Sequence, residues 1–357
     1  MCSEPDTFVQ TLKNIKMKKV IILSLLPLTA MAAPSLKGFE KTYQDWDLIC
    51  DNTGTCNMAG YPEGDGSEHS VSILFTRSAG EKAPVTAQLA LLPDELGNKT
   101  AEIILNGQSL GTIQNFSEEG NAKLSEKQTT ELLTALKGNA SIEVVFGEFK
   151  EKVSDKGAAA AMLKMDEFQQ RLNTPSALIR QGQEKHAVLA PQAAPKIEAV
   201  SVNNHKTIEL KRGEKQFKHV LALLRKAYDG CVDEDLESQD ITLYPLTQNK
   251  VLAEALCASG AYQSTNYYAV LDDKLSKVEQ VLEDQYNFAY YDEKLNALIV
   301  EGSFKSGGIG DSWYGHEAAW NGKTFITTAE YTSGSGKGFM GGAWGGLPTF
   351  VSEINVK

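Results

Sequence analysis

The sequence predicts an α+β fold in which β-strands dominate, and three observations lead to this prediction. Short apolar or alternating runs, each of strand length, occupy residues 46–50, 56–59, 71–76, 85–92, 101–105 and 142–146. Asn106-Gly107 and Asn321-Gly322 lie between such runs, and Asn-Gly is the preferred pair for a two-residue hairpin turn because both positions need positive φ. Three other segments instead repeat apolar residues with the helical period, at about 126–137, 158–172 and 217–229.

The first of these helices is marked at both ends. Ser125 and Gln128 have the spacing of a capping box, and Gly138 follows as a stop signal. The other two helices are recognised by a single apolar stripe each. The stripes are Ala161, Met165, Phe168 and Leu172 in one, and Phe217, Val220, Leu221 and Leu224 in the other.

The order of these elements predicts two domains. Residues 33–186 form a β-sandwich-like domain with two helices, and residues 201–357 form a domain of one helix plus antiparallel strands. Residues 187–200 are a linker rich in alanine and proline. Its first part, residues 187–195, is uncharged and contains Pro191 and Pro195, which favour an extended chain.

The N-terminus has the features of a cleavable signal peptide. Lys18 and Lys19 precede an apolar run at 20–30, and Ala30-Met31-Ala32 supplies the small residues that signal peptidase needs. Residues 1–32 are therefore a leader, with Met17 as the natural start and Ala33 as the first residue after cleavage. The run is well short of the ~20 residues that a membrane helix requires. We expect a periplasmic or secreted protein with no membrane span after cleavage.

The net charge of the chain restricts the partners that it can bind. Residues 1–32 hold four of the 35 basic and two of the 46 acidic side chains, so the remaining 325 residues carry a formal charge of −13. This charge argues against nucleic acid or an anionic membrane surface as a partner.

Four cysteines remain after the leader, and they fall into two local pairs, Cys50/Cys56 and Cys231/Cys257. An even number in an oxidising compartment predicts disulfides. Closing these loops would stabilise the protein by roughly 2.4 and 3.5 kcal/mol. No Cys-x-x-Cys is present and the five histidines are scattered, so no metal site is predicted.

Four short motifs resemble catalytic or ligand-binding signatures, but none has the context that its chemistry needs. Ser109 lies in a Gly-x-Ser-x-Gly pattern that follows a hairpin turn, whereas a nucleophile elbow requires a strand-to-helix turn. His316-Glu317 lacks the second histidine of a zinc-binding helix, since Trp320 stands there. The glycine-rich stretch 334–338 lacks the Ser or Thr of a P-loop, and the acidic stretch 233–237 lacks the glycine of an EF-hand and is predicted to be a solvated turn. No catalytic residue and no cofactor are predicted.

Several segments resemble the bacterial family called domain of unknown function 1176. They are residues 46–61, residues 158–182 with Met165-Asp166-Glu167 and Gln170-Arg171-Leu172, and Gly308-Ile309-Gly310-Asp311 followed by Trp320-Asn321-Gly322. Residues 46–61 also resemble the invasion-associated locus B proteins, which are exported and β-rich. The resemblance implies a periplasmic or secreted protein and no catalytic residues.

Residues 302–346 contain 13 of the 30 glycines, together with three of the four tryptophans. Their aromatic and neighbouring side chains either fill a small β core or form a recognition surface for another protein or a glycan. The candidate surface is Trp313, Tyr314, His316, Phe339, Met340 and Trp344. We expect a non-enzymatic envelope protein that binds a protein, such as an inhibitor of a cell-wall enzyme or toxin. The alternative is an envelope hydrolase whose carboxylates and His316 meet only in the fold.

Overall fold

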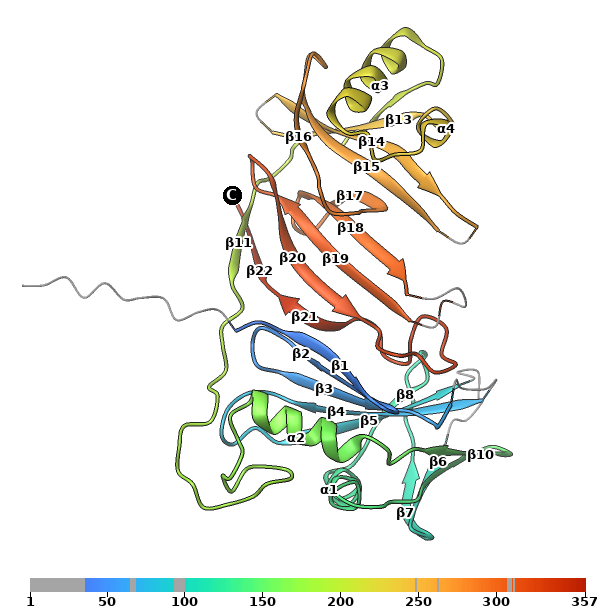
Figure 1. The fold of residues 1–357 in the computed structure, drawn as a ribbon, viewed down its shortest axis with the longest axis vertical. Helices are drawn as coiled ribbons and strands as arrows, with labels where there is room; N and C mark the ends of the chain where they lie inside the picture. The colour runs from blue at the N-terminus through green and yellow to red at the C-terminus, as the bar shows by residue number, and fades with distance from the viewer. Residues whose placement is uncertain are drawn as a thin grey trace, which may run out of the picture. The chain divides into compact units, whose positions relative to one another are not determined.

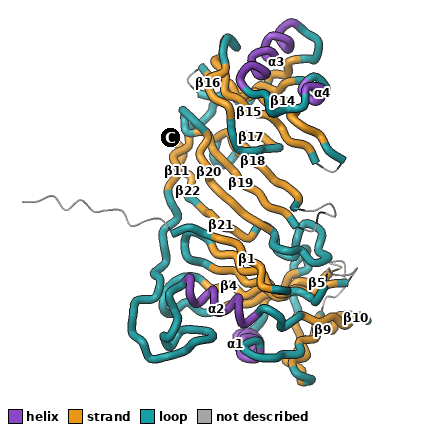
Figure 2. Tube along the Cα trace, in the orientation of Figure 1, coloured by secondary structure: helices purple, strands orange, loops and turns teal. Residues whose placement is uncertain are grey.

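The computed structural model describes residues 36–64, 69–92, 100–247, 249–261, 263–306, 310 and 312–357. The predicted leader of residues 1–32 lies outside them. Strands dominate the described chain and helices are few (Figures 1 and 2), which confirms the predicted fold class. Among the described helices, none combines the length and hydrophobicity needed to cross a bilayer.

The first half contains two antiparallel sheets. In the six-stranded sheet the order is β1 (Phe39–Tyr43), β2 (Trp46–Cys50), β3 (Cys56–Gly60), β4 (Ser70–Arg77), β5 (Val85–Leu92) and β8 (Asn121–Lys123). The four-stranded sheet has the order β10 (Phe149–Val153), β9 (Ile142–Phe146), β6 (Ala101–Leu105) and β7 (Gln108–Ile113). β6 and β7 are joined at Asn106 and Gly107, whose φ values are 51° and 80°. The predicted hairpin is therefore present.

One apolar core joins these two sheets to two helices, α1 (Glu126–Ala135) and α2 (Ala158–Phe168). The inward residues of β2–β5 meet those of β6 and β9, and both helices add buried side chains to the same cluster. α1 begins at the predicted capping box, where Gln128 N donates to Ser125 Oγ and Ser125 N donates to Gln128 Oε1.

The second half contains two five-stranded antiparallel sheets. One has the order β12 (Ile208–Leu210), β13 (Ile241–Pro245), β14 (Lys250–Ser259), β15 (Ser264–Asp272) and β16 (Val278–Val281). The other has the order β17 (Phe288–Asp292), β18 (Ala297–Lys305), β19 (Trp313–Trp320), β20 (Phe325–Thr332) and β21 (Leu347–Val351). Leu252 and Val270 of the first pack with Val300 and Trp320 of the second in one buried cluster.

The other face of the β12–β16 sheet is covered by α3 (Lys215–Ala227). All four residues of its predicted stripe are buried there: Phe217, Val220, Leu221 and Leu224. A further pair of strands, β11 (Lys196–Ala199) and β22 (Glu353–Val356), packs against Ile299 and Ala319 of the β17–β21 sheet.

The glycine-rich segment after β20 reaches the first half of the chain. Phe339, Trp344 and Leu347 form a buried cluster with Ile49 and Leu74 of the six-stranded sheet. By its contacts, Leu36–Lys357 is one compact unit. Two domains docked through an interface of this kind would give the same contacts, so the division at residues 187–200 stays a prediction.

Three local features differ from the sequence expectation. α2 ends at Phe168 rather than near Leu172, because Gln170 has a φ of 54° and the chain turns back. The acidic stretch expected as a turn forms a short helix, α4 (Asp233–Leu236). β11 lies within the predicted linker of residues 187–200, and it pairs in parallel with β22, whereas antiparallel strands were predicted for residues 201–357.

Candidate functional site

The six residues of the predicted surface do not lie together. Phe339 and Trp344 are 6% and 4% exposed and belong to the core cluster on the six-stranded sheet. The Trp344 indole donates to the hydroxyl of Ser72 at 2.9 Å, deep in this contact. These two aromatic residues therefore fill a core, as the alternative interpretation expects. Met340, in contrast, is 83% exposed.

The other three residues lie on β19 and point to opposite faces of its sheet. Tyr314 and His316 lie beside Phe304, with ring centroids 5.6 and 6.3 Å away. Trp313 is on the other face, where the Lys305 ammonium lies 5.4 Å from its ring centre. The structure thus divides this part of the predicted surface between two sides of one sheet.

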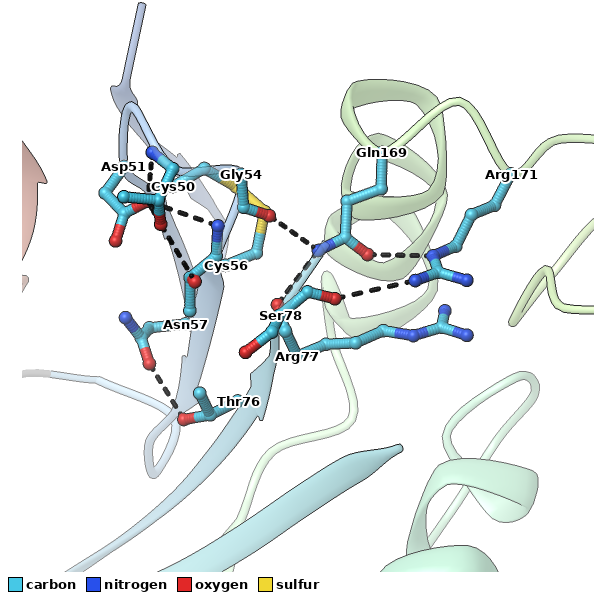
Figure 3. Close-up of a disulfide and its surroundings, with 12 residues drawn as sticks. Cys50, Asp51, Gly54, Cys56, Asn57, Thr76, Arg77, Ser78, Gln169 and Arg171 are labelled. Atoms are coloured by element: carbon cyan, nitrogen blue, oxygen red, sulfur yellow. Dashed lines mark hydrogen bonds between the residues drawn. A yellow bond between two sulfur atoms is a disulfide. The ribbon is translucent and has the colours of Figure 1, made fainter. Parts of the chain in front are cut away.

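Both predicted disulfides are present, Cys50–Cys56 and Cys231–Cys257. The first closes the β2–β3 hairpin, and Gln169 from the end of α2 packs beside it (Figure 3). The Gln169 amide donates to the carbonyls of Gly54 and Arg77, both at 2.9 Å. The disulfide loop, β4 and α2 are therefore joined by one side chain.

This contact is part of a larger buried network around Arg171. Its side chain is fully buried and donates to Gln169 Oε1 and to the carbonyl of Ser78 (Figure 3). It also donates to Ser176 Oγ and to the carbonyls of residues 80 and 81. Asp166 accepts from the amides of Leu178 and Ile179 and pairs with Arg77 at 3.4 Å. Because Arg77, Asp166 and Arg171 are themselves buried, their bonds fix the loop after α2.

A different group of side chains, gathered on the β17–β21 sheet, is accessible. Glu301 of β18 lies directly opposite Glu317 of β19, so both carboxylates lie on one face of the sheet. Phe288 of the edge strand β17 pairs with Glu301, and Tyr290 follows two residues later on the same face. Phe288 and Tyr290 are 54% and 38% exposed. With Tyr331 of β20 they form what we call the carboxylate face: Phe288, Tyr290, Glu301, Glu317 and Tyr331.

Tyr331 crosses this face because residue 315 is a glycine. Gly315 pairs with Tyr331 in the strand register, and a Cβ on residue 315 would lie 2.5 Å from the Cζ and hydroxyl oxygen of Tyr331. The ring therefore lies against the backbone of β19 and reaches the next strand. There its hydroxyl donates to Glu301 Oε1 at 2.9 Å. Gly315 thus allows the bond between Tyr331 and Glu301.

The ionisable groups of the face influence one another. Burial raises the pKa of Glu317, and the negative charges of Glu301 and Asp292 raise it further. The pKa of Tyr331 is raised to about 12, first by burial and then by its bond to Glu301. Burial, followed by the nearby carboxylates, raises the pKa of Tyr290 to about 12. The face therefore combines concentrated negative charge with tyrosines that remain protonated at neutral pH.

The sequence did not identify this face, because its residues come from four strands that meet only through the sheet register. The available signal was Glu301, an acid within the otherwise apolar start of β18. The rejected motifs occupy other settings. Ser109 lies on β7 and donates to Glu102, in a hairpin rather than an elbow. His316 and Glu317 lie on a strand, and within the described residues no group of His, Cys, Asp or Glu is arranged to hold a metal ion.

Comparison with known proteins places the chain in a family. The model of DUF1176, described as a protein of unknown function, matches residues 40–351. This chain belongs to the DUF1176 family. It is also similar to the uncharacterized protein YpfG of Escherichia coli strain K12, with 22% identity over 268 residues that cover 71% of this chain and 72% of YpfG. No solved structure matches.

The family assignment confirms the resemblance drawn from residues 46–61, 158–182 and 308–322. Of the last segment, Gly308, Ile309 and Asp311 lie outside the described residues. The additional resemblance to the invasion-associated locus B proteins stays a prediction. The family description names no function, so the comparisons assign no role to the side chains described above.

Proposed function

We propose that this member of DUF1176 is an exported envelope protein that binds another protein through the carboxylate face. Its partner presents a lysine or arginine to Glu301 and Glu317. The observation that carries the proposal is the direct opposition of these two carboxylates on a sheet face flanked by exposed aromatic rings. Two disulfides and the predicted signal peptide support an oxidising compartment outside the cytoplasm.

A cationic partner follows from the electrostatics of the pair. Like charges directly opposite each other on neighbouring strands destabilise a sheet. Here the pKa of Glu317 is raised first by burial and then by the charge of Glu301. A guanidinium or ammonium group between the carboxylates would remove this repulsion. Tyr290 could stack on the same cation, since tyrosine rings attract cations at close range.

A protein partner, rather than a small molecule, fits the position of the face. Phe288 and Tyr290 stand on the edge strand β17, and aromatic residues of this kind are enriched where proteins bind one another. The predicted charge of −13 after cleavage would also increase the rate of encounter with a basic protein. Basic cell-wall enzymes and toxins are the partner class that we propose, with the chain acting as their inhibitor.

The test is a comparison of variants in a pull-down from periplasmic extract of the producing bacterium. The mature protein is compared with Glu301→Gln/Glu317→Gln and with a control, Glu148→Gln, which removes the charge of an exposed glutamate in the β9–β10 turn. We expect a basic protein to be captured by the mature protein and the control. With the captured protein purified, the double variant should bind at least tenfold more weakly. Equal binding by all three proteins would contradict the proposal.

One observation favours a second function, an envelope hydrolase. The carboxylates have different surroundings, because Glu301 accepts the Tyr331 hydroxyl while the pKa of Glu317 is raised by burial. A pair of carboxylates in unlike environments is the usual acid and base arrangement of glycosidases. Release of soluble fragments from purified peptidoglycan, abolished in Glu317→Gln but not in Glu148→Gln, would establish this alternative over the first.

A further inference from the structure

A groove of about 540 Å³ runs along α3, far in sequence from the carboxylate face and independent of its proposed role. Its lining combines apolar and charged residues: Arg212, Phe217, Lys218, Leu221, Arg225 and Glu237. The volume is within the range of small-molecule sites. A lining of this kind would fit a ligand that is apolar at one end and charged at the other.

The floor of the groove is rigid and apolar. Phe217 and Leu221 are 3% and 4% exposed, since both pack into the core between α3 and the β12–β16 sheet. Ala222, on the exposed side of the helix, adds a small apolar wall. Because these side chains are held by the core, the floor exists before any ligand arrives.

The rim carries three cations, of which Arg225 is held in salt bridges and Arg212 lies near the charge of Asp240. Arg225 is paired with Asp233 at 3.0 Å and with Glu237 at 2.6 Å, so its charge is compensated. Arg212 donates to the carbonyl of Ser238 at 3.0 Å. Within the described part of the chain, neither Arg212 nor Lys218 forms an ion pair with a carboxylate.

Lysines and arginines are concentrated in one short segment of an acidic protein, although two of them, Lys211 and Arg225, are paired with carboxylates outside it. Residues 211–226 contain six lysines and arginines and a single acid, Glu214, although the whole chain has a net charge of −11. The apolar stripe of α3 is buried in the core, so this helix has no free apolar face that could insert into a bilayer. What it leaves outside is a basic rim above an apolar floor.

We propose that the α3 groove binds a single anionic amphiphile, a molecule with a phosphate or carboxylate beside an apolar chain. The apolar part lies on Phe217 and Leu221, and the anion lies between Arg212 and Lys218. Both cations can donate hydrogen bonds to phosphate or carboxylate oxygens. In the envelope, lipids with anionic headgroups have this chemistry, and so do free phosphorylated metabolites with an apolar group.

The proposal is tested by isothermal titration of the mature protein with three probes: octyl phosphate, octyl glucoside and inorganic phosphate, each below any micelle-forming concentration. We expect octyl phosphate to bind at least tenfold more tightly than either of the others. It alone has both an apolar chain that can contact the floor and an anion that can bind the cations of the rim. Equal binding of octyl glucoside would show that the anion is not recognised, and equal binding of inorganic phosphate would show that the floor is not used. Either result overturns the proposal.

Variants locate the site. Arg212→Gln/Lys218→Gln should weaken octyl phosphate binding about tenfold, while Lys215→Gln/Lys226→Gln makes the same charge change on α3 outside the groove and should leave binding within twofold. Ala222→Glu, at an exposed helix position, should abolish binding through repulsion and bulk without disturbing the core. Equal weakening by both double variants would mean a general basic surface and would refute the groove.

A vesicle-binding experiment distinguishes a lipid headgroup from a free amphiphile as the natural ligand. Vesicles of phosphatidylglycerol and of phosphatidylcholine are titrated with the mature protein and with the same two double variants. Binding to phosphatidylglycerol that depends on Arg212 and Lys218 identifies a lipid headgroup. Binding of octyl phosphate without any vesicle binding identifies a free amphiphile, and failure of both probes to bind overturns the proposal.

Discussion

Replacing Asp166 with asparagine should destabilise the protein by about 3 kcal/mol, although the two side chains have nearly the same shape. Asp166 is fully buried and is the carboxylate that faces the buried guanidinium groups of Arg77 and Arg171. Burial, and then the charge of Arg171, already lowers the pKa of Arg77 to about 10. Asparagine would remove the counter-charge of Arg77, would leave Arg171 with Glu81 as its nearby carboxylate, and would place an amide where the carboxylate accepts.

The magnitude comes from opposing contributions. Breaking a buried ion pair by removing one partner costs about 3 to 5 kcal/mol. Burial raises the pKa of Asp166 despite its bonds from the amides of Leu178 and Ile179, so ionised Asp166 itself carries a desolvation cost that asparagine avoids. We therefore take the lower end of that range. For a unit of this size, about 3 kcal/mol corresponds to a fall in Tm of roughly 5 °C.

The assay is urea unfolding followed by tryptophan fluorescence, with Glu167→Gln as the matched control. Glu167 is the next residue on α2, but its carboxylate is 58% exposed and pairs with Lys164 at the surface, so its loss should cost less than about 0.5 kcal/mol. A second variant, Asp166→Asn with Arg77→Met, should recover part of the loss because it removes one unpaired charge. If Asp166→Asn and Glu167→Gln proved equally stable, the buried network would have no energetic role.

Mass spectrometry of the exported protein should find Ala33 as the first residue, and an intact Met1 or Met17 would contradict export by this leader. Replacing Cys231 and Cys257 by serine should lower stability by roughly 3.5 kcal/mol, read from denaturation under non-reducing conditions, and no loss would mean that the bridge is not formed. Glu317→Gln should raise Tm by about 1 °C at pH 7, because a folded-state pKa raised by burial and by Glu301 makes ionised Glu317 unfavourable. The gain should vanish near pH 3, well below the ordinary pKa of 4.5, where the wild-type carboxyl is protonated in both states. A gain that does not change with pH would refute the linkage.

Local signals in the sequence predicted local structure well. The capping box at Ser125 and the turn at Asn106 and Gly107 depend on residues within a few positions, and both are present. The predicted end of α2, near Leu172, was wrong because the actual end depends on a distant contact. Gln169 leaves the helical pattern to bond Gly54, more than a hundred residues away, and no local propensity contains that partner.

The candidate site was beyond the reach of such signals. Phe339 and Trp344 look like surface aromatics in a glycine-rich stretch, yet their partners are Ile49 and Leu74 on another sheet. Glu301 and Glu317 become neighbours only because β18 and β19 pair in one particular register, and a shift of one residue would put them on opposite faces. Composition fixes neither the partner sheet nor the register.

Net charge, finally, is a poor guide to the ligands of this protein at short range. The negative total predicts repulsion of long polyanions, whose phosphates interact with the whole charge distribution. At physiological ionic strength, however, charges farther than about 8 Å are largely screened. A single anionic headgroup in the α3 groove would interact mainly with Arg212 and Lys218, whereas a cation on the carboxylate face would interact mainly with Glu301 and Glu317. One acidic chain can therefore hold ligands of opposite charge on separate surfaces, and the sign of each site has to be taken from its nearest side chains.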